Sequence, residues 1–337
     1  MGKTPISKYG EFGLIKHLTE NIKLKNSSSL KGVGDDAAVL DYKDKKVLVT
    51  TDLLLEGIHF DLTYVPLKHL GYKSAVVNFS DIYAMNGTPK QITVSIGVSQ
   101  RFFTEDLEEL YDGIKLACEQ YGVDLVGGDT SASMTGLTIS ITCLGEGEAD
   151  KIVYRNGAKE TDIICVSGNL GAAYMGLQLL EREKAIFKGQ TDFEPDFKGK
   201  DYILERQLKP EARREIIELL RKNDILPTAM MDVSDGLSSE IMHICKQSEV
   251  GCRVYEERMP IDYQTATMAE EFNMNLTTAA LHGGDDYELL FTVPVTLHEK
   301  INNIKDVKVI GYITDKEEGK MLQTRDGGCF DLKSQAW

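Results

Sequence analysis

Aspartate residues recur in this sequence at the ends of apolar segments and beside glycines, where a folded chain can present them to a ligand. Any single aspartate is common as a turn residue or helix cap, so only the recurrence of several in this context indicates a functional site. Carboxylate oxygens suit Mg²⁺, and neighbouring glycines let the backbone approach phosphates closely. The pattern therefore predicts one or more Mg²⁺ ions that bridge protein carboxylates to a polyphosphate. The segments are GVGDDAAVL (32–40), VLVTTD (47–52), LVGGD (125–129), MMDVSDGL (230–237) and GGDD (283–286), and Asp81 lies one helical turn after Asn78 in a further segment.

The sequence contains none of the standard nucleotide-binding motifs, and only single residues indicate how a nucleotide would be bound. The sequence has no G-x-x-x-x-G-K-[ST] motif, which excludes a P-loop. The stretch GVGDDA loosely matches G-x-G-x-x-A, but a polar SSSLK precedes it where a dinucleotide-binding fold needs a strand. Ser234, at a predicted helix N-terminus, can offer its hydroxyl and backbone N–H to a phosphate. Arg155 can clamp another phosphate, although an exposed surface arginine fits that position equally well.

Composition and charge restrict the class of protein. The 337 residues carry a net charge of −15, which disfavours binding to nucleic acid or to an anionic membrane. The apolar runs are too short to cross a bilayer and the N-terminus lacks a secretory signal, so we expect a cytoplasmic protein. The six cysteines form no CxxC pair, which argues against zinc and favours reduced, buried thiols.

Apolar periodicity predicts the elements that would position these residues. Thr104 is expected to cap one helix that Gly122 ends, and Pro210 to start another. The segment 184–200 is polar and interrupted by glycine and proline, so it is predicted to be an exposed excursion. Helices are expected at 12–22, 67–85, 104–121, from 172, at 211–222 and at 237–247. Strands are expected at 37–40, 47–51, 92–98, 123–126, 137–144, 163–166, 229–233, 252–255, 288–293 and 307–313.

The polar, glycine-rich stretch 145–151 predicts a boundary between two domains, residues 1–150 and 151–337. On both sides of it strands alternate with helices. The expected fold class is therefore α+β, or mixed α/β, with sheets backed by helices in each domain.

Eight segments in register resemble those of the thiamine-monophosphate kinases, within the aminoimidazole ribonucleotide synthetase-like superfamily. They cover nearly the whole chain, and TTDLLLEGIHF and GGDDYEL favour the kinases over their relatives. The resemblance implies a two-domain aminoimidazole ribonucleotide synthetase-like fold, whose N-terminal sheets pair across a homodimer into a barrel. The segments are GEFGLI (10–15), GVGDDAAVL (32–40), TTDLLLEGIHF (50–60), NFSDIYAMNGTP (78–89), LVGGDT (125–130), YRNGAK (154–159), MDVSDGL (231–237) and GGDDYELLFTVP (283–294).

The same resemblance implies an activity and a set of site residues. The activity is ATP-dependent, Mg²⁺-dependent phosphorylation of thiamine monophosphate to thiamine diphosphate, the last step in making that cofactor. The implied ligands of several Mg²⁺ ions are Asp36, Thr50, Thr51, Asp52, Asp81, Asp129, Asp232 and Asp235. The implied nucleotide contacts are Gly128, Asp129, Arg155 and Ser234. The implied contacts with the acceptor substrate are His59, Asp285 and Trp337.

Two positions depart from the family pattern. Asp285 stands where the family often has glutamate, so its carboxylate is one methylene closer to the backbone. The family usually ends with an aromatic residue followed by a short tail, whereas this chain stops at SQAW. Trp337 can stack on the thiamine rings, or it can simply be a frayed terminus.

The chemistry of the acceptor indicates the mechanism. A phosphate has a second pKa of about 6 and is already anionic at neutral pH, so neither a general base nor a protein nucleophile is required. The obstacle is repulsion between two phosphates, which bound metal ions would neutralise; direct in-line transfer is expected. The alternatives are another ATP-dependent member of the superfamily, such as the ribonucleotide synthetase, or a non-catalytic divalent-metal-binding protein. Selenophosphate synthesis is disfavoured because the N-terminal segment has no cysteine.

Overall fold

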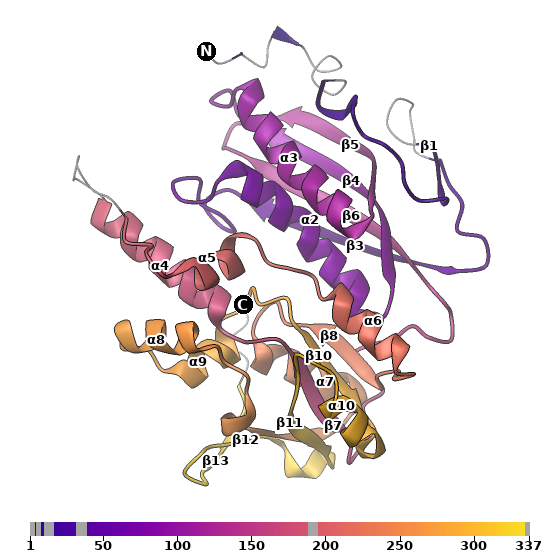
Figure 1. The fold of residues 1–337 in the computed structure, drawn as a ribbon, viewed down its shortest axis with the longest axis vertical. Helices are drawn as coiled ribbons and strands as arrows, with labels where there is room; N and C mark the ends of the chain where they lie inside the picture. Colours follow the sequence, from indigo (N-terminus) through magenta and orange to yellow (C-terminus); the bar gives the residue numbers. More distant parts are fainter. Residues whose placement is uncertain (1–3, 5–7, 10–16, 32–38, 188–194, 334–337) are drawn as a thin grey trace. The chain divides into compact units, whose positions relative to one another are not determined.

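The computed structural model describes residues 4, 8–9, 17–31, 39–187 and 195–333, and it divides the chain into two units (Figure 1). The first unit comprises residues 1–82 and 87–150, and the second comprises residues 83–86 and 151–337. The predicted site residues Asp36 and Trp337 lie outside the described residues. Both units combine sheets with helices, as the alternating apolar pattern predicts.

A four-stranded sheet in the order β3-β6-β4-β5 forms the centre of the first unit, and α2 and α3 lie side by side against one face of it (Figure 1). β3 pairs antiparallel with β6 along its whole length, and β4 runs parallel to β5. The short strands β1 and β2 form a separate ladder. The elements are β1 (Ser29–Lys31), β2 (Val39–Leu40), β3 (Lys46–Leu55), α2 (Leu67–Ala84), β4 (Thr88–Val98), α3 (Thr104–Tyr121), β5 (Asp124–Ala132) and β6 (Thr138–Gly147).

The two faces of this sheet differ in burial because side chains alternate along each strand. Leu48 and Leu54 of β3 are buried, on the face that α2 and α3 cover. Val47, Val49 and Leu53 of the same strand are 44%, 65% and 53% exposed. These three residues, with the side chains that share their face, define what we call the open face of the sheet.

The ends of α3 show which capping predictions hold. Gly122 ends the helix in the left-handed conformation (φ 70°), as predicted. The prediction of Thr104 as the N-cap is wrong, because the cap is Phe103, whose N–H donates to the Asp106 carboxylate at 2.7 Å. Within the described part of the chain, the buried Thr104 hydroxyl has no hydrogen-bond partner.

A seven-stranded sheet in the order β13-β12-β9-β11-β7-β10-β8 forms the centre of the second unit. Helix α7 packs on it, since buried residues of α7 and of these strands belong to one apolar core. Helices α4, α5, α8 and α9 enclose a second, smaller core. The strands are β7 (Ile163–Ser167), β8 (Ala229–Asp232), β9 (Gly251–Tyr255), β10 (Leu289–Val293), β11 (Val307–Thr314), β12 (Lys320–Gln323) and β13 (Cys329–Asp331). The helices are α4 (Ala172–Phe187), α5 (Asp201–Leu208), α6 (Arg214–Lys222), α7 (Leu237–Ser248), α8 (Tyr263–Glu271), α9 (Leu276–His282) and α10 (His298–Asn302), with 3-10 turns η2 (Glu256–Arg258), η3 (Val295–Leu297) and η4 (Lys316–Glu318).

Several predicted boundaries are wrong. Helix α6 begins at Arg214, so Pro210 lies before the helix and not at its start. Helix α4 continues to Phe187, into the segment predicted to be an excursion. In the predicted helix 12–22, the described helical residues are 17–19, and residues 20–21 form a turn. α5, α8, α9, α10, β1, β12 and β13 have no counterpart among the predicted elements.

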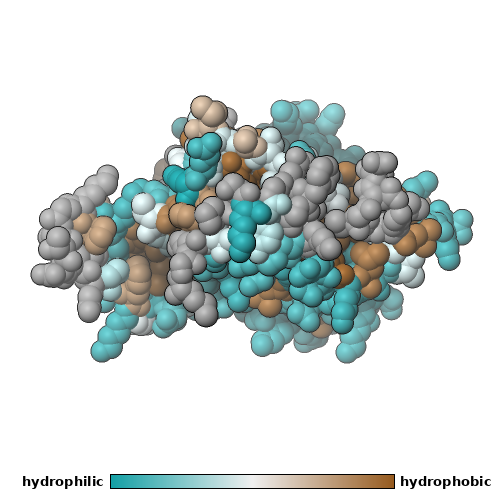
Figure 2. Space-filling view, turned by 90° about the horizontal axis from the view of Figure 1, so that it is seen from above, coloured by the Kyte–Doolittle hydropathy of each residue, from teal (hydrophilic) through white to brown (hydrophobic). Residues whose placement is uncertain are grey.

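The surface and the thiols of the described residues agree with the composition. Hydrophilic side chains, drawn in teal, alternate with smaller brown hydrophobic groups over the face seen in Figure 2. Of the six cysteines, all unpaired, five are buried and Cys329 is exposed. In the part of the chain that the structure describes, none of the helices is both long and apolar enough to span a membrane.

Candidate functional site

Two carboxylates and a hydroxyl converge in the first unit. Alternation along β3 places Thr50 and Asp52 on the face that is covered by α2, the helix that carries Asp81. The Thr50 hydroxyl donates to Asp81 Oδ2 at 2.5 Å. Burial, and to a smaller extent the charge of Asp81, raises the pKa of Asp52 to about 6. The two carboxylates therefore repel each other in a partly buried site from which water is largely excluded. A bound cation would relieve that repulsion.

Neither Asp52 nor Asp129 lies at the end of a strand, contrary to prediction. β3 continues to Leu55 and β5 continues to Ala132. The reason is pairing: the β3–β6 ladder extends to the Leu55–Thr138 pair, so backbone hydrogen bonding continues past the polar TTD residues. Asp232, in contrast, does end β8, one residue before the predicted end of that strand at Val233.

The ladder separates the predicted metal ligands of the first unit onto two faces. One row across the sheet contains Asp52, Ile141, Val94 and Gly128, and the next contains Leu53, Ser140, Ser95 and Asp129. Adjacent rows face opposite sides, so the exposed Asp129 side chain belongs to the open face, away from Asp52. The structure therefore does not bring these two carboxylates together within one chain.

Thr51 also belongs to the open face. Its hydroxyl donates to the Ile141 carbonyl at 3.2 Å and accepts from the Thr142 hydroxyl at 3.1 Å. Its side chain is thus turned away from that of Thr50. Gly128 has a packing role of its own, because a Cβ there would lie 2.0 Å from the Val94 carbonyl oxygen of the adjacent strand.

His59 lies in the exposed turn that follows β3. Its Nδ1 accepts the backbone N–H of Leu55 at 3.0 Å. This bond anchors the ring to the end of the strand while the side chain remains accessible, which is compatible with the predicted contact to a substrate.

The turn after β8 carries the predicted residues Ser234 and Asp235. Ser234 is half-buried and Asp235 is exposed. Glu240, in the first turns of α7, accepts the backbone N–H groups of Ser234 at 3.1 Å and of Asp235 at 2.8 Å through one carboxylate oxygen. The Ser234 N–H, predicted to be offered to a phosphate, is therefore already occupied. Burial raises the pKa of Glu240 to about 7.

The loop that contains Asp285 lies against this turn. The N–H of Asp285 donates to the Ser234 carbonyl at 2.7 Å, and the N–H of Tyr287 donates to the Val233 carbonyl at 2.8 Å. The predicted acceptor contact Asp285 is thus brought beside the predicted nucleotide contact Ser234. Arg155 is exposed, at a bend in the segment before β7.

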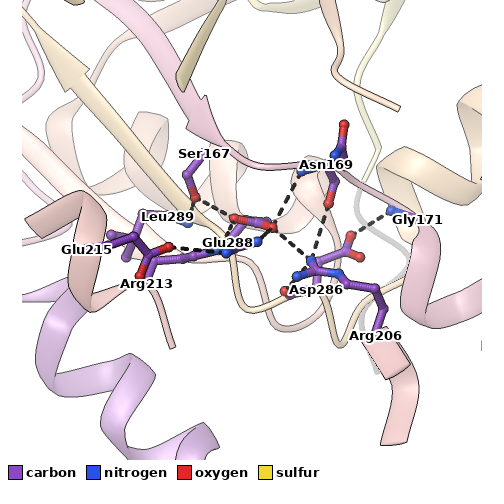
Figure 3. A network of polar contacts seen from close by, with 9 residues as sticks. All are labelled: Ser167, Asn169, Gly171, Arg206, Arg213, Glu215, Asp286, Glu288 and Leu289. Atoms are coloured by element: carbon purple, nitrogen blue, oxygen red, sulfur yellow. Dashed lines mark hydrogen bonds and ion pairs between the residues drawn. The ribbon is translucent and has the colours of Figure 1, made fainter. Parts of the chain in front are cut away.

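A network of buried polar contacts holds Asp286 and Glu288, which follow Asp285 in the chain, in the protein interior (Figure 3). Glu288 is fully buried and accepts from Arg206 at 2.8 Å, from Arg213 Nε at 2.6 Å and from the Ser167 hydroxyl at 2.6 Å. Burial alone would raise the pKa of Glu288, but the attraction of the two arginines outweighs it and holds that pKa below its usual value. Asp286 is also fully buried, and it accepts the N–H of Gly171 at 2.8 Å.

Sequence reasoning did not identify Glu240 or Glu288 as parts of this site, and it noted Asp286 only as the second aspartate of the GGDD segment. Glu240 follows the aspartate turn within one short segment, and that spacing was the only local signal. Glu288 is 82 residues from Arg206 and 75 from Arg213, so no local pattern relates them. Among residues 17–31, 39–187 and 195–333, no group of three or more His, Cys, Asp and Glu side chains forms a ready metal centre.

Comparisons with known proteins agree with the two-unit architecture. The family model "AIR synthase related protein, N-terminal domain" matches residues 34–146, and the corresponding C-terminal domain model matches residues 159–322. The chain is 34% identical to thiamine-monophosphate kinase from Aquifex aeolicus (strain VF5), over 95% of this chain and 98% of that protein. It is 32% identical to the Bacillus subtilis (strain 168) protein of the same name, over 97% of this chain and 98% of that one.

A solved structure extends this likeness to three dimensions. The structure described as AaThiL complexed with AMPPCP and TMP superposes with a TM-score of 0.74, at 34% sequence identity, and the match covers 97% of each chain. That protein was therefore captured with a nucleotide analogue and TMP together.

Proposed function

The chain belongs to the thiamine-monophosphate kinase family, and on that premise we propose that it transfers the γ-phosphoryl group of ATP to thiamine monophosphate, giving thiamine diphosphate and ADP. Membership makes it an ATP-using phosphotransferase of thiamine biosynthesis. The observation that carries the proposal is full-length similarity to a protein with both AMPPCP and TMP bound. The buried, unpaired cysteines suit a reducing cytoplasm, where we place the activity.

The donor atoms of the first unit fit Mg²⁺. Thr50, Asp52 and Asp81 offer only oxygen, which a hard cation prefers. Burial, and to a smaller extent the neighbouring charge of Asp81, raises the pKa of Asp52, so an ionised Asp52 would gain from a cation. A bound Mg²⁺ would neutralise phosphate charge and hold the phosphates in position. Thr50 would orient the Asp81 carboxylate through its hydrogen bond. Asp36, Thr51, Asp129, Asp232 and Asp235 remain predicted ligands.

Transfer is proposed to be direct and in line. The acceptor oxygen is already anionic at neutral pH, so the chain needs only to bind and align the two substrates. Glu240 fixes the Ser234–Asp235 turn, the Asp285 loop is hydrogen-bonded to that same turn, and both are thereby held rigidly for binding. Inversion at a chiral γ-phosphate is expected, and retention of configuration would contradict direct transfer.

The activity is tested by ADP release with purified protein, ATP and Mg²⁺. Release is expected with thiamine monophosphate and not with formylglycinamidine ribonucleotide, the acceptor of the ribonucleotide synthetase. Chelation with EDTA is expected to abolish release, and excess Mg²⁺ to restore it. The opposite acceptor preference would assign the chain to the synthetase branch, and release that survives EDTA would reject the metal requirement.

We further propose that two chains pair through the open face of the first unit, which forms the expected barrel. Val47, Val49 and Leu53 give this face an exposed apolar stripe, whose burial would be favourable. Asp129 faces the same side, so pairing there would require a cation to compensate its charge.

Val49→Asp is therefore expected to convert a homodimer to a monomer at micromolar concentration, because it would bury an unpaired charge in the interface. Sedimentation velocity measures this. Val295→Asp is the matched control, since Val295 is 50% exposed in the second unit and its substitution should leave the dimer intact. A monomeric wild-type chain, or a Val49→Asp variant that stays dimeric, would reject this interface.

A further inference from the structure

The Asp285 loop has an unusual backbone. Gly284, Asp285 and Tyr287 adopt left-handed conformations with φ of +71°, +58° and +50°. Glycine does so readily, but aspartate and especially the bulky tyrosine do so at a cost in free energy. Such conformations persist only where surrounding contacts fix them, and they are concentrated at functional sites.

Successive residues of this loop are held by different parts of the second unit. The N–H groups of Asp285 and Tyr287 bond the carbonyls of Ser234 and Val233. Between them, Asp286 points into the protein, where its carboxylate accepts the Gly171 N–H and its carbonyl accepts from Arg206 Nη2 at 2.9 Å. Arg206 also bonds Glu288, one residue past Tyr287 (Figure 3).

The same arginine therefore grips the loop at two alternate residues, Asp286 and Glu288. Glu288 in turn requires Gly168 opposite, because a Cβ there would lie 2.1 Å from its carboxylate oxygen. The strained conformation is therefore held by hydrogen bonds to buried Asp286 and by the buried ion pair of Glu288 with Arg206.

Two side chains of the loop are also hydrogen-bonded to each other. The Tyr287 hydroxyl donates to Asp285 Oδ1 at 2.9 Å. Tyr287 is 9% exposed, which means that its ring is held by packing and can act as a rigid support.

We infer that Tyr287 is a positioning residue, which orients the Asp285 carboxylate toward the acceptor substrate, and that the buried Asp286, Arg206 and Glu288 side chains hold both in place. This rests on the proposed function, in which Asp285 contacts thiamine monophosphate. Asp285 is short, so its carboxylate stays near the backbone and within reach of the tyrosine hydroxyl. The geometry makes one specific hydroxyl responsible for acceptor affinity and not for nucleotide affinity.

The test is steady-state kinetics of Tyr287→Phe, which removes only the hydroxyl. The expected result is a KM for thiamine monophosphate raised about tenfold, as for loss of a hydrogen bond to a charged group. The KM for ATP is expected to stay unchanged. Tyr312→Phe in β11 is the matched control, and it should alter neither KM.

A double-mutant cycle separates orientation from a general loss of packing. In an Asp285→Ala background, adding Tyr287→Phe should change the KM for thiamine monophosphate by less than about twofold. An equal rise in both KM values, a tenfold effect that persists without Asp285, or no effect at all would overturn the inference. A wild-type protein that fails to phosphorylate thiamine monophosphate would overturn the proposed function instead, so the two failures are distinguishable.

Discussion

Asp52→Asn is expected to lower kcat by about 10³-fold while stabilising the metal-free protein. The loss of turnover follows from removing a charge that would neutralise phosphate in the reaction, where single electrostatic groups contribute about 10²–10³-fold. The gain in stability follows because burial, and to a smaller extent the charge of Asp81, makes ionisation of Asp52 costly, and an amide does not ionise. Opposite effects on activity and stability are typical of a residue that is needed for function but lowers the stability of the fold.

The stability effect has a defined pH window. The pKa of Asp52 is about 6 in the folded protein, compared with the ordinary aspartate value of 3.8 that applies to the unfolded chain. A raised carboxyl pKa means that stability is highest where the group is protonated in both states and falls as pH rises from about 4 to about 6. The amide of the Asp52→Asn variant does not titrate in this range. The variant should therefore exceed wild type by at most about 3 kcal/mol above pH 6 and match it near pH 3.5.

Two control variants make this result specific. Asp112→Asn removes an exposed carboxylate from α3 and should change neither property. Asp124→Asn should destabilise the protein, because that buried carboxylate accepts from Lys25 N–H at 2.5 Å, Asn26 N–H at 2.9 Å and the Ser29 hydroxyl at 2.5 Å. If Asp52→Asn behaved like Asp124→Asn and left turnover intact, the aspartates would be structural and the non-catalytic alternative would gain support.

Glu288→Gln is expected to destabilise the second unit by about 3 kcal/mol or more. It leaves the buried Arg206 and the half-buried Arg213 without the carboxylate that compensates their charges, and breaking a buried ion pair costs about 3–5 kcal/mol. Urea unfolding followed by circular dichroism measures the loss.

Glu271→Gln is the matched control for burial. Glu271 also bonds two cations, Arg182 at 2.6 Å and Lys200 at 2.5 Å, but its side chain is 41% exposed. Its substitution should cost less than about 1 kcal/mol. Equal losses at the two positions would show that burial does not set the strength of these networks.

The Glu288 network also predicts a direction with pH. The pKa of Glu288 is held below its usual value, so its contribution is present above the unfolded-state value of about 4.5 and is lost as pH falls through the folded-state pKa. The stability difference between wild type and Glu288→Gln should therefore shrink in acid. A difference that grew on acidification would contradict the assignment of a charged Glu288.

The fold was predictable where a segment carries its own signal. The two long predicted helices of the first unit, α2 and α3, lie within one residue of their predicted bounds. Strand ends were not predictable where pairing overrides composition: the polar residues before Leu53 look like the end of a strand, but the partner strand β6 continues it. Pro89 likewise stands inside β4, where a shift in register accommodates it.

The candidate site divides in the same way. Asp52, Asp81, Ser234 and Asp285 lie in short motifs whose residue types alone indicate chemistry, and the structure gives each of them neighbours consistent with a role. What could not be read is which face each side chain takes and what holds it there. Asp129 and Asp52 are both strand aspartates, but the ladder register places them on opposite faces, and no one-dimensional pattern contains that register.

The assignment of residues 83–86 to the second unit bears on how this protein can be divided experimentally. Arg221 of α6 donates from Nε to the Asn86 side-chain oxygen at 2.9 Å and from Nη2 to the Asn86 carbonyl at 2.5 Å. The Asn86 amide in turn donates to the Lys151 carbonyl at 2.9 Å. A fragment that starts at residue 151 would lack Asn86 and leave Arg221 without these hydrogen bonds. A fragment that ends at residue 150 would contain residues 83–86 without the second unit, to which they belong. Expression of either half alone should therefore give material prone to aggregation, whereas co-expression of the two fragments should let residues 83–86 regain their neighbours.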